Sequence, residues 1–217
     1  MKLAGAIFEL YGVVVDTAKF HYLAWKELAA ALGFDFTPED GERIKGVSRM
    51  AALDVVLSVG HIELAESEKE ALADQKNARY VAYLDTLSEA DILPGVAAFI
   101  AGLKERGVKT AIGSASKNTP FILKKLGLDQ TFDAVADGNV VSKAKPDPEV
   151  FVTAARMIGL EPARCAVFED AIAGVEAANR GGMVSFGVGS AEVLTEAAHV
   201  IPDFTNYEAL LQCFDGR

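Results

Sequence analysis

The chain has 217 residues, 51% of them apolar, so it is long enough to bury a hydrophobic core and is not expected to be disordered. Its 21 basic and 31 acidic side chains give a formal net charge of −10, which disfavours nonspecific binding to nucleic acid. The two cysteines, Cys165 and Cys213, form no CxxC pattern, so neither a disulfide framework nor a zinc site is expected.

The first predicted element is a buried parallel strand at residues 3–10, where nearly every side chain is small or apolar. Glu9 and Tyr11 stand at the end of this strand. Ligands of open α/β sheets bind beyond the carboxyl ends of the strands, so both side chains are candidates for a functional site.

The segment from residue 17 to residue 92 reads as helical throughout. Helical patterns occupy residues 18–32, 49–59 and 66–88. Helix-length stretches inserted after a first strand predict a separate four-helix domain over residues 17–92. Residues 1–16 and 93–217 then form the other predicted domain.

Four further apolar strands follow, and helical patterns separate them. The strands are predicted at residues 108–114, 134–135, 165–169 and 183–188, and the helices at 95–105, 119–126, 148–158 and 171–180. This alternation predicts an α/β fold, a parallel sheet with helices on both faces. No apolar run approaches the ~20 residues of a membrane-spanning helix, and no signal-peptide pattern is seen. We therefore expect a cytoplasmic protein without a membrane partner.

A serine loop and a lysine follow two of these elements. The loop Ser114-Ala115-Ser116-Lys117-Asn118 lies between a strand and a helix, where a hydroxyl and free amides can cradle a phosphate. A simple N-cap explains the loop equally well. Lys145 precedes Pro146 in a segment held extended, and its ammonium could neutralise phosphate charge. Taken alone, a solvated lysine is the better interpretation.

Two adjacent carboxylates, Glu169 and Asp170, end an otherwise apolar strand. Buried acids there are costly unless a cation compensates them, and oxygen ligands suit a hard divalent ion such as Mg²⁺. An N-cap role would explain Asp170 and would leave Glu169 unexplained.

In chain order, the strand-end acid, serine, lysine and acid pair resemble the motifs of the haloacid dehalogenase (HAD) superfamily. The first motif of that superfamily usually reads D-x-D-G-x-[VL]-x-D-[ST]. Four further strings narrow the resemblance to the β-phosphoglucomutase family: FHYLAWK from residue 20, KGVSR from residue 45, QKN from residue 75 and SASKN from residue 114. The resemblance covers the whole chain. It implies a Rossmann-like core and a helical cap inserted after the first motif.

The resemblance also implies an activity and roles for residues. An acidic nucleophile would form an acyl-phosphate, and β-glucose 1-phosphate would become glucose 6-phosphate through a bisphosphate intermediate. The implied catalytic residues are Glu9, Tyr11, Ser114 and Lys145. The implied Mg²⁺ ligands are the Glu9 carboxylate, the Tyr11 carbonyl, Glu169 and Asp170. The implied substrate-binding residues are Thr17, His21, Trp25, Gly46, Arg49, Lys76, Ala115, Ser116, Lys117 and Asn118.

Two letters of the first motif depart from the family, because Glu9 and Tyr11 stand where it has aspartates. If nothing adjusts, the extra methylene of Glu9 moves its nucleophilic oxygen by more than about one ångström, and a misplacement of about 1 Å can cost around 10²-fold in rate. The Tyr11 phenol has an ordinary pKa of about 10, so it can donate a hydrogen bond but is a poor base at neutral pH. General acid–base catalysis contributes roughly 10²- to 10⁴-fold.

Three functions are compatible with these letters. The leading prediction is Mg²⁺-dependent sugar-phosphate phosphotransfer of the β-phosphoglucomutase type. The alternatives are a non-catalytic sugar-phosphate-binding relative and a sugar phosphatase of the HAD superfamily. In each case a small sugar phosphate is the expected partner, nucleic acid is not, and we expect a monomer.

Overall fold

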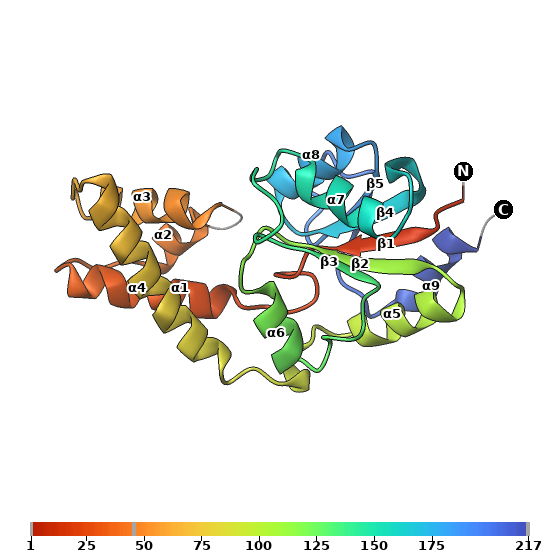
Figure 1. The fold of residues 1–217 in the computed structure, drawn as a ribbon, viewed down its shortest axis with the longest axis horizontal. Helices are drawn as coiled ribbons and strands as arrows, with labels where there is room; N and C mark the ends of the chain where they lie inside the picture. The colour runs from red at the N-terminus through yellow and green to blue at the C-terminus, as the bar shows by residue number, and fades with distance from the viewer. Residues whose placement is uncertain (1, 45–46, 216–217) are drawn as a thin grey trace. The chain divides into compact units, whose positions relative to one another are not determined.

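The computed structural model describes residues 2–44 and 47–215 of the chain. Within them lies a six-stranded sheet with the order β3-β2-β1-β4-β5-β6, in which every pair of neighbours is parallel (Figure 1). The strands are β1 (Gly5–Phe8), β2 (Lys109–Gly113), β3 (Ala134–Ala136), β4 (Cys165–Glu169), β5 (Val184–Val188) and β6 (His199–Ile201). The predicted parallel sheet is confirmed.

Consecutive side chains of β1 face opposite sides of the sheet, as strand geometry requires. Ile7 is fully buried in a cluster with Phe151 of α7 (Glu149–Met157). Phe8 stacks on Phe168 of β4 at 5.0 Å between ring centroids and meets Phe99 of α5 edge to face at 6.0 Å. The helices of this part of the chain are α5 (Val96–Glu105), α6 (Thr119–Lys125), α7 (Glu149–Met157), α8 (Ile172–Arg180) and α9 (Tyr207–Leu211). Helices therefore cover both faces, as predicted (Figure 1).

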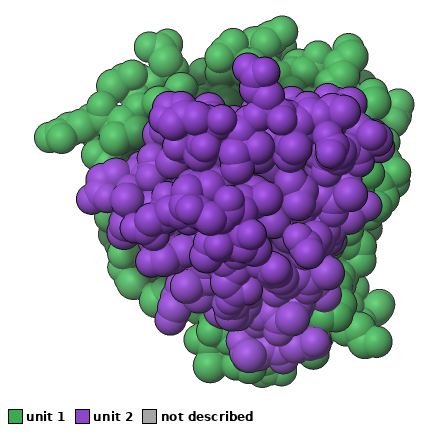
Figure 2. Space-filling model, turned by 90° about the vertical axis from the view of Figure 1, so that its left-hand side faces the viewer, with its two compact units in different colours: residues 1–16, 88–217 green, residues 17–87 purple. Residues whose placement is uncertain are grey.

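The chain divides into two compact units, coloured separately in Figure 2. Unit 1 contains residues 1–16 and 88–217 and holds the sheet, and unit 2 contains residues 17–87. The described helices of unit 2 are α1 (Ala18–Ala31), α2 (Pro38–Glu42), α3 (Arg49–Val59) and α4 (Glu66–Leu84). Unit 2 has a core of its own, in which Trp25 and Phe36 are almost completely buried.

Residues 88–92 belong by their contacts to unit 1, whereas the sequence pattern places them in the helical segment. Helix α4 ends at Leu84, and the chain then forms a short 3₁₀ helix at Glu89–Asp91. Ile92 pairs with Val15 in an isolated antiparallel bridge, and the Leu93 amide donates to the Val14 carbonyl at 2.9 Å. These backbone bonds attach the segment to the sheet unit.

The sequence pattern misses the shortest elements. Strand β6 has three residues, and α2 and α9 have five each, which is too short for a periodicity to register. Helix α2 does carry a local signal, since Thr37 and Asp40 form a capping box around its first turn. Two further 3₁₀ turns lie at Pro162–Arg164 and Gln212–Phe214. Among the described residues, no helix combines the length and apolarity needed to cross a membrane.

Candidate active site

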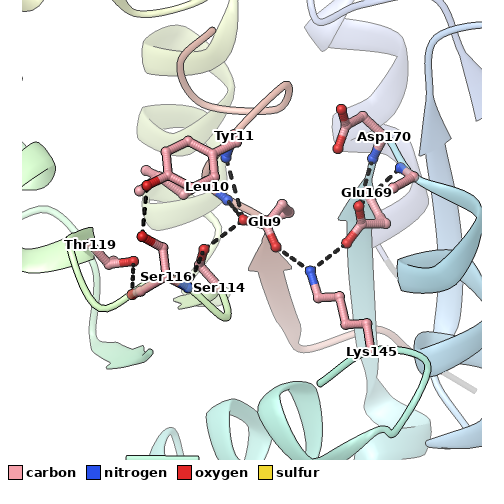
Figure 3. Close-up of polar contacts among 10 residues, drawn as sticks. Glu9, Leu10, Tyr11, Ser114, Ser116, Thr119, Lys145, Glu169 and Asp170 are labelled. Carbon is pink, nitrogen blue, oxygen red and sulfur yellow. Dashed lines mark hydrogen bonds and ion pairs between the residues drawn. The ribbon is translucent and has the colours of Figure 1, made fainter. Parts of the chain in front are cut away.

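The strand order places the predicted site where the direction in which successive strands are added to the sheet reverses. β1 lies between β2 and β4, so the chain winds outward on either side of it, and crevices form at such switch points beyond the strand ends. Glu9 follows β1, Ser114 follows β2 and Glu169 ends β4. Figure 3 shows these three side chains converging.

Both oxygens of the Glu9 carboxylate have partners. Oε1 accepts hydrogen bonds from the Ser114 hydroxyl at 2.6 Å and from the amides of Leu10 at 2.8 Å and Tyr11 at 3.4 Å. Oε2 forms an ion pair with the Lys145 ammonium. The Glu9 side chain is 9% exposed, so this carboxylate is held in a nearly dry environment.

Lys145 links the first and last of the predicted motifs. Its ammonium lies between the Glu9 carboxylate and that of Glu169, which is 2.7 Å away, and 4.6 Å from the ring centroid of Phe151 (Figure 3). Burial works to lower the pKa of Lys145, but the Glu169 and Glu9 carboxylates outweigh it and hold the pKa above its ordinary value. The lysine is therefore a fixed positive charge at neutral pH.

The turn after β4 is built around the Glu169 carboxylate. Its Oε1 accepts from the amides of Asp170 at 3.1 Å and Ala171 at 3.0 Å. A Cβ on Gly174 would lie 2.0 Å from Glu169 Oε2, so only glycine lets α8 begin this close to the carboxylate. Burial raises the pKa of Glu169, and the nearby Glu9 carboxylate adds to the rise, against the opposing effect of Lys145.

Asp170 lies beside the turn that follows β1. A Cβ on Gly12 would lie 2.0 Å from its Oδ2, and Gly12 has a φ of +70°, so this close approach also requires glycine. Desolvation, followed by the charges of Glu169 and Glu9, raises the pKa of Asp170 to about 8. Burial and the neighbouring carboxylates thus outweigh the opposing charge of Lys145 at Asp170.

The predicted metal ligands have suitable chemistry for a metal ion, but the structure does not group them around a common point. Among the described residues, no three His, Cys, Asp or Glu side chains are grouped so as to hold a metal ion. The Lys145 ammonium lies between Glu9 and Glu169, and the Asp170 carboxylate points away from it (Figure 3). The donor set nevertheless fits a hard divalent cation, because a single ammonium offsets the charge of three nearby carboxylates and only oxygen ligands are offered.

The serine loop is ordered by its own hydrogen bonds. The Tyr11 phenol and the Ser116 hydroxyl are hydrogen-bonded at 2.7 Å, and Ser116 Oγ also accepts from the Asn118 amide at 3.2 Å. Thr119 Oγ1 donates to the Ser116 carbonyl at 2.8 Å. Ala115 and Lys117 are exposed in this loop. Both serines of the loop thus contact residues of the first motif.

Unit 2 gathers a second group of the predicted residues. Lys76 is 3% exposed, and its amine lies 2.9 Å from Nδ1 of His21, 4.6 Å from the Trp25 ring centroid and 4.8 Å from that of Tyr80. Burial, assisted by the charge of Arg49, lowers the pKa of Lys76 to about 7. Burial likewise lowers the pKa of His21, with Lys76 and then Arg49 contributing.

Arg49 and Thr17 lie near this group. Arg49 Nη2 donates to Asn77 Oδ1 at 2.9 Å, and its Nη1 lies 3.5 Å from a carboxylate oxygen of Asp74. Thr17, fully buried at the start of α1, accepts from the Tyr80 hydroxyl at 3.2 Å. Gly46, also predicted as a substrate-binding residue, lies outside the described residues.

Two aromatic residues of these clusters are absent from the sequence prediction. Tyr80 stacks on His21 at 3.9 Å between ring centroids, and Phe151 faces Lys145. Tyr80 could have been found, because it follows Lys76 by one helical turn on the same face of α4. Phe151 carries no local signal, since only the fold brings α7 to the end of β1.

Comparison with known proteins identifies the family. The protein-family model of the haloacid dehalogenase-like hydrolases matches residues 3–182 of the chain. The chain belongs to this family. The HAD-like sheet unit and the order of its strand-end residues agree with the resemblance found in the sequence.

Individual relatives within the HAD family are close over most of the chain. A β-phosphoglucomutase of Bacillus subtilis is 38% identical over 201 residues, which are 92% of this chain and 89% of the relative. A crystal structure of β-phosphoglucomutase from Clostridium difficile superposes with a TM-score of 0.91 at 36% identity, covering 98% of this chain and 97% of the other. A fructose-1-phosphate phosphatase of Escherichia coli is 30% identical over 182 residues, 84% of this chain and 94% of that protein.

Proposed function

We propose that this chain transfers phosphoryl groups on sugar phosphates in the manner of a β-phosphoglucomutase, converting β-glucose 1-phosphate to glucose 6-phosphate. The observation that supports this most strongly is the contact of the Glu9 carboxylate with both the Ser114 hydroxyl and the Lys145 ammonium at the carboxyl edge of the sheet. A carboxylate, a hydroxyl and an ammonium are the groups needed to accept a phosphoryl group and to neutralise its charge. The similarity to β-phosphoglucomutases points to the same reaction.

In the proposed reaction, a Glu9 oxygen attacks phosphorus of the bisphosphate, forming an O–P bond as the bond from phosphorus to the sugar oxygen breaks. The departing sugar oxygen takes a proton, for which the Tyr11 phenol is the proposed donor. Ser114 donates a hydrogen bond to the transferring group, and Lys145 offsets its charge. When the group comes from the 1-position, the sugar leaves as glucose 6-phosphate. The 6-hydroxyl of an incoming β-glucose 1-phosphate then attacks the phosphorus, the bond from phosphorus to Glu9 breaks, the hydroxyl proton passes to the Tyr11 oxygen, and the bisphosphate is regenerated.

The proposed cofactor is Mg²⁺. Glu9, the Tyr11 carbonyl, Glu169 and Asp170 would hold it, and it would supply positive charge beside the transferring phosphoryl group. Its binding would also compensate the carboxylate charge that raises the pKa of Asp170.

Substrate binding is proposed for the basic group of unit 2 and for the exposed part of the serine loop. Arg49 and Lys76 would contact the distal phosphate or the sugar, with Lys117 and Asn118 of the loop. Thr17, His21, Trp25, Ala115 and Ser116 complete the proposed substrate-binding set.

A coupled assay tests the proposal. Production of glucose 6-phosphate from β-glucose 1-phosphate is measured with Mg²⁺ and β-glucose 1,6-bisphosphate supplied, for this chain and its Glu9→Asp, Tyr11→Asp double variant. We expect slow turnover of the chain itself and a rate higher by roughly 10²-fold or more in the double variant. No glucose 6-phosphate from either protein would refute the proposal.

A second candidate is non-catalytic binding of sugar phosphates, which the fully engaged Glu9 carboxylate favours. Saturable binding of β-glucose 1-phosphate without product, together with turnover by the double variant, would identify this function. Measuring inorganic phosphate in the same reactions separates both candidates from a sugar phosphatase, which would release it.

A further inference from the structure

The Glu9 carboxylate has the environment of a bound anion. One hydroxyl donor, two backbone amides and one ammonium surround it, from Ser114, Leu10, Tyr11 and Lys145. Charge-assisted donors of this kind are what proteins use to hold phosphate and other oxyanions. In this structure the anion they hold is a side chain of the protein itself.

The length of the glutamate side chain explains how it reaches this position. An aspartate is shorter by one C–C bond, about 1.5 Å. With the same backbone, its carboxylate would be drawn back by up to that length from two groups that Glu9 contacts, Ser114 Oγ at 2.6 Å and Lys145 Nζ. The additional methylene therefore carries the carboxylate into contact with both groups at once.

We infer that Glu9 is a built-in ligand of the phosphoryl-binding groups, so that an incoming phosphate must displace the Glu9 carboxylate before it can reach Ser114 and Lys145. This inference rests on the proposed function of the same site and adds to it the contact that phosphate must replace. Displacement would leave an anionic phosphate next to the Glu169 and Glu9 carboxylates, which opposes binding.

The hydroxyl of Ser116, the other serine of the loop, is also bonded to a side chain of the first motif. The Ser116 hydroxyl is bonded to the Tyr11 phenol at 2.7 Å, so both serines of the loop contact the two residues that depart from the family motif. The Ala115 amide differs, because no described residue accepts a hydrogen bond from it. An entering phosphate would therefore find one donor available while Ser114 is held by Glu9.

Binding of inorganic phosphate tests the inference without requiring turnover. The dissociation constant is measured by isothermal titration calorimetry for the native chain and for the Glu9→Asp and Glu9→Ala variants. A chelator is present, because Glu9 is itself a proposed Mg²⁺ ligand. Glu208→Ala, which removes an exposed acid from α9, is the control for the change in net charge. We expect phosphate to bind at least about tenfold more tightly to both Glu9 variants, and Glu208→Ala to match the native chain.

Equal phosphate affinity in the native chain and in both Glu9 variants would overturn the inference. An equal gain in Glu208→Ala would also overturn it, because net charge alone would then explain the effect. Thermal unfolding of each variant checks that it is folded, and Glu9→Asp keeps the test valid if Glu9→Ala fails to fold. Tight phosphate binding by a Glu9→Asp, Tyr11→Asp variant that makes no glucose 6-phosphate would support the inference while rejecting the proposed function.

Discussion

Charge balance in the strand-end cluster depends on single residues. Glu9 and Glu169 are buried carboxylates whose common ion-pair partner is Lys145, and neither is more than 9% exposed. Desolvation of an ion pair is expensive, and the energy is recovered only while both signs are present. Lys145 is therefore the residue whose removal should affect the stability of the cluster most.

We predict that Lys145→Met lowers the free energy of unfolding by about 3–5 kcal/mol in the presence of a chelator, because two buried carboxylates lose their counter-charge. Added Mg²⁺ should reduce the difference in free energy of unfolding between Lys145→Met and the native chain, since a divalent cation can replace the lost positive charge. Urea unfolding followed by circular dichroism measures both effects. Lys143→Met is the control, because the Lys143 side chain is 66% exposed and should cost little. A loss in Lys145→Met no larger than in Lys143→Met would contradict the prediction.

The buried amine of Lys76 gives unit 2 a distinct pH dependence. In the unfolded chain its pKa is the ordinary 10.5, and in the folded unit burial and the charge of Arg49 lower it to about 7. At pH values between these two pKa values, the unfolded state binds more protons than the folded state, so the free energy of unfolding rises with pH. Below about pH 7 both states are protonated, and the contribution of Lys76 no longer changes.

We predict that unit 2 becomes more stable by about 2 kcal/mol between pH 7 and pH 9, and that Lys76→Met removes most of this slope. Trp25 is the single tryptophan of the sequence and lies against Lys76, so its fluorescence during urea unfolding reports on this unit. The titration of His21 lies below its ordinary pKa of 6.5 and does not interfere in this range. If the free energy of unfolding of Lys76→Met rises with pH as steeply as that of the native chain, groups other than Lys76 cause the pH dependence.

Among the secondary-structure elements, those that position the site are the ones the sequence predicts well. β1, β2 and β4 are short apolar runs that end in Glu9, Ser114 and Glu169, and their composition reveals both the strand and its polar end. The contacts between the side chains of the site cannot be predicted from the sequence in the same way. That the Glu9 carboxylate is held by Ser114 and Lys145 depends on side-chain length and on contacts more than 100 residues apart in sequence.

Helix α8 begins against the Glu169 carboxylate, and Gly174 makes this possible. Replacing glycine by alanine inside a helix ordinarily gains about 0.5–1 kcal/mol. Here the new Cβ would lie 2.0 Å from Glu169 Oε2, and such overpacking costs about 1–3 kcal/mol. The clash should therefore outweigh the gain in helix propensity.

We predict a net loss of stability in Gly174→Ala, together with weaker Mg²⁺ binding, because the Glu169 carboxylate must move. Thermal unfolding with and without Mg²⁺ measures both. Glu176→Ala, at a more exposed position of the same helix, should change stability by no more than about 0.5 kcal/mol. A Gly174→Ala protein as stable as the native chain, with the same response to Mg²⁺, would show that the carboxylate has room to shift.

At the scale of the whole molecule, two hydrophobic cores are built from separate parts of the sequence. Unit 1 buries the faces of its sheet, and unit 2 buries Trp25 and Phe36 among its own helices. The proposed Mg²⁺ ligands all belong to unit 1. A unit with its own core can unfold without the other, and a ligand stabilises only the unit whose folded state it binds.

We therefore predict that Mg²⁺ slows amide hydrogen exchange in unit 1 and leaves unit 2 unaffected. At a concentration 100 times its dissociation constant, a ligand stabilises the folded state by about 2.7 kcal/mol, which is about a hundredfold in the rate of exchange through global opening. Mass spectrometry of peptides from β1 and β4, compared with peptides from α3 and α4, measures the two units in one sample. Equal slowing in all four peptides would mean that the units open together, and no slowing in β1 and β4 would argue against Mg²⁺ binding at the strand ends.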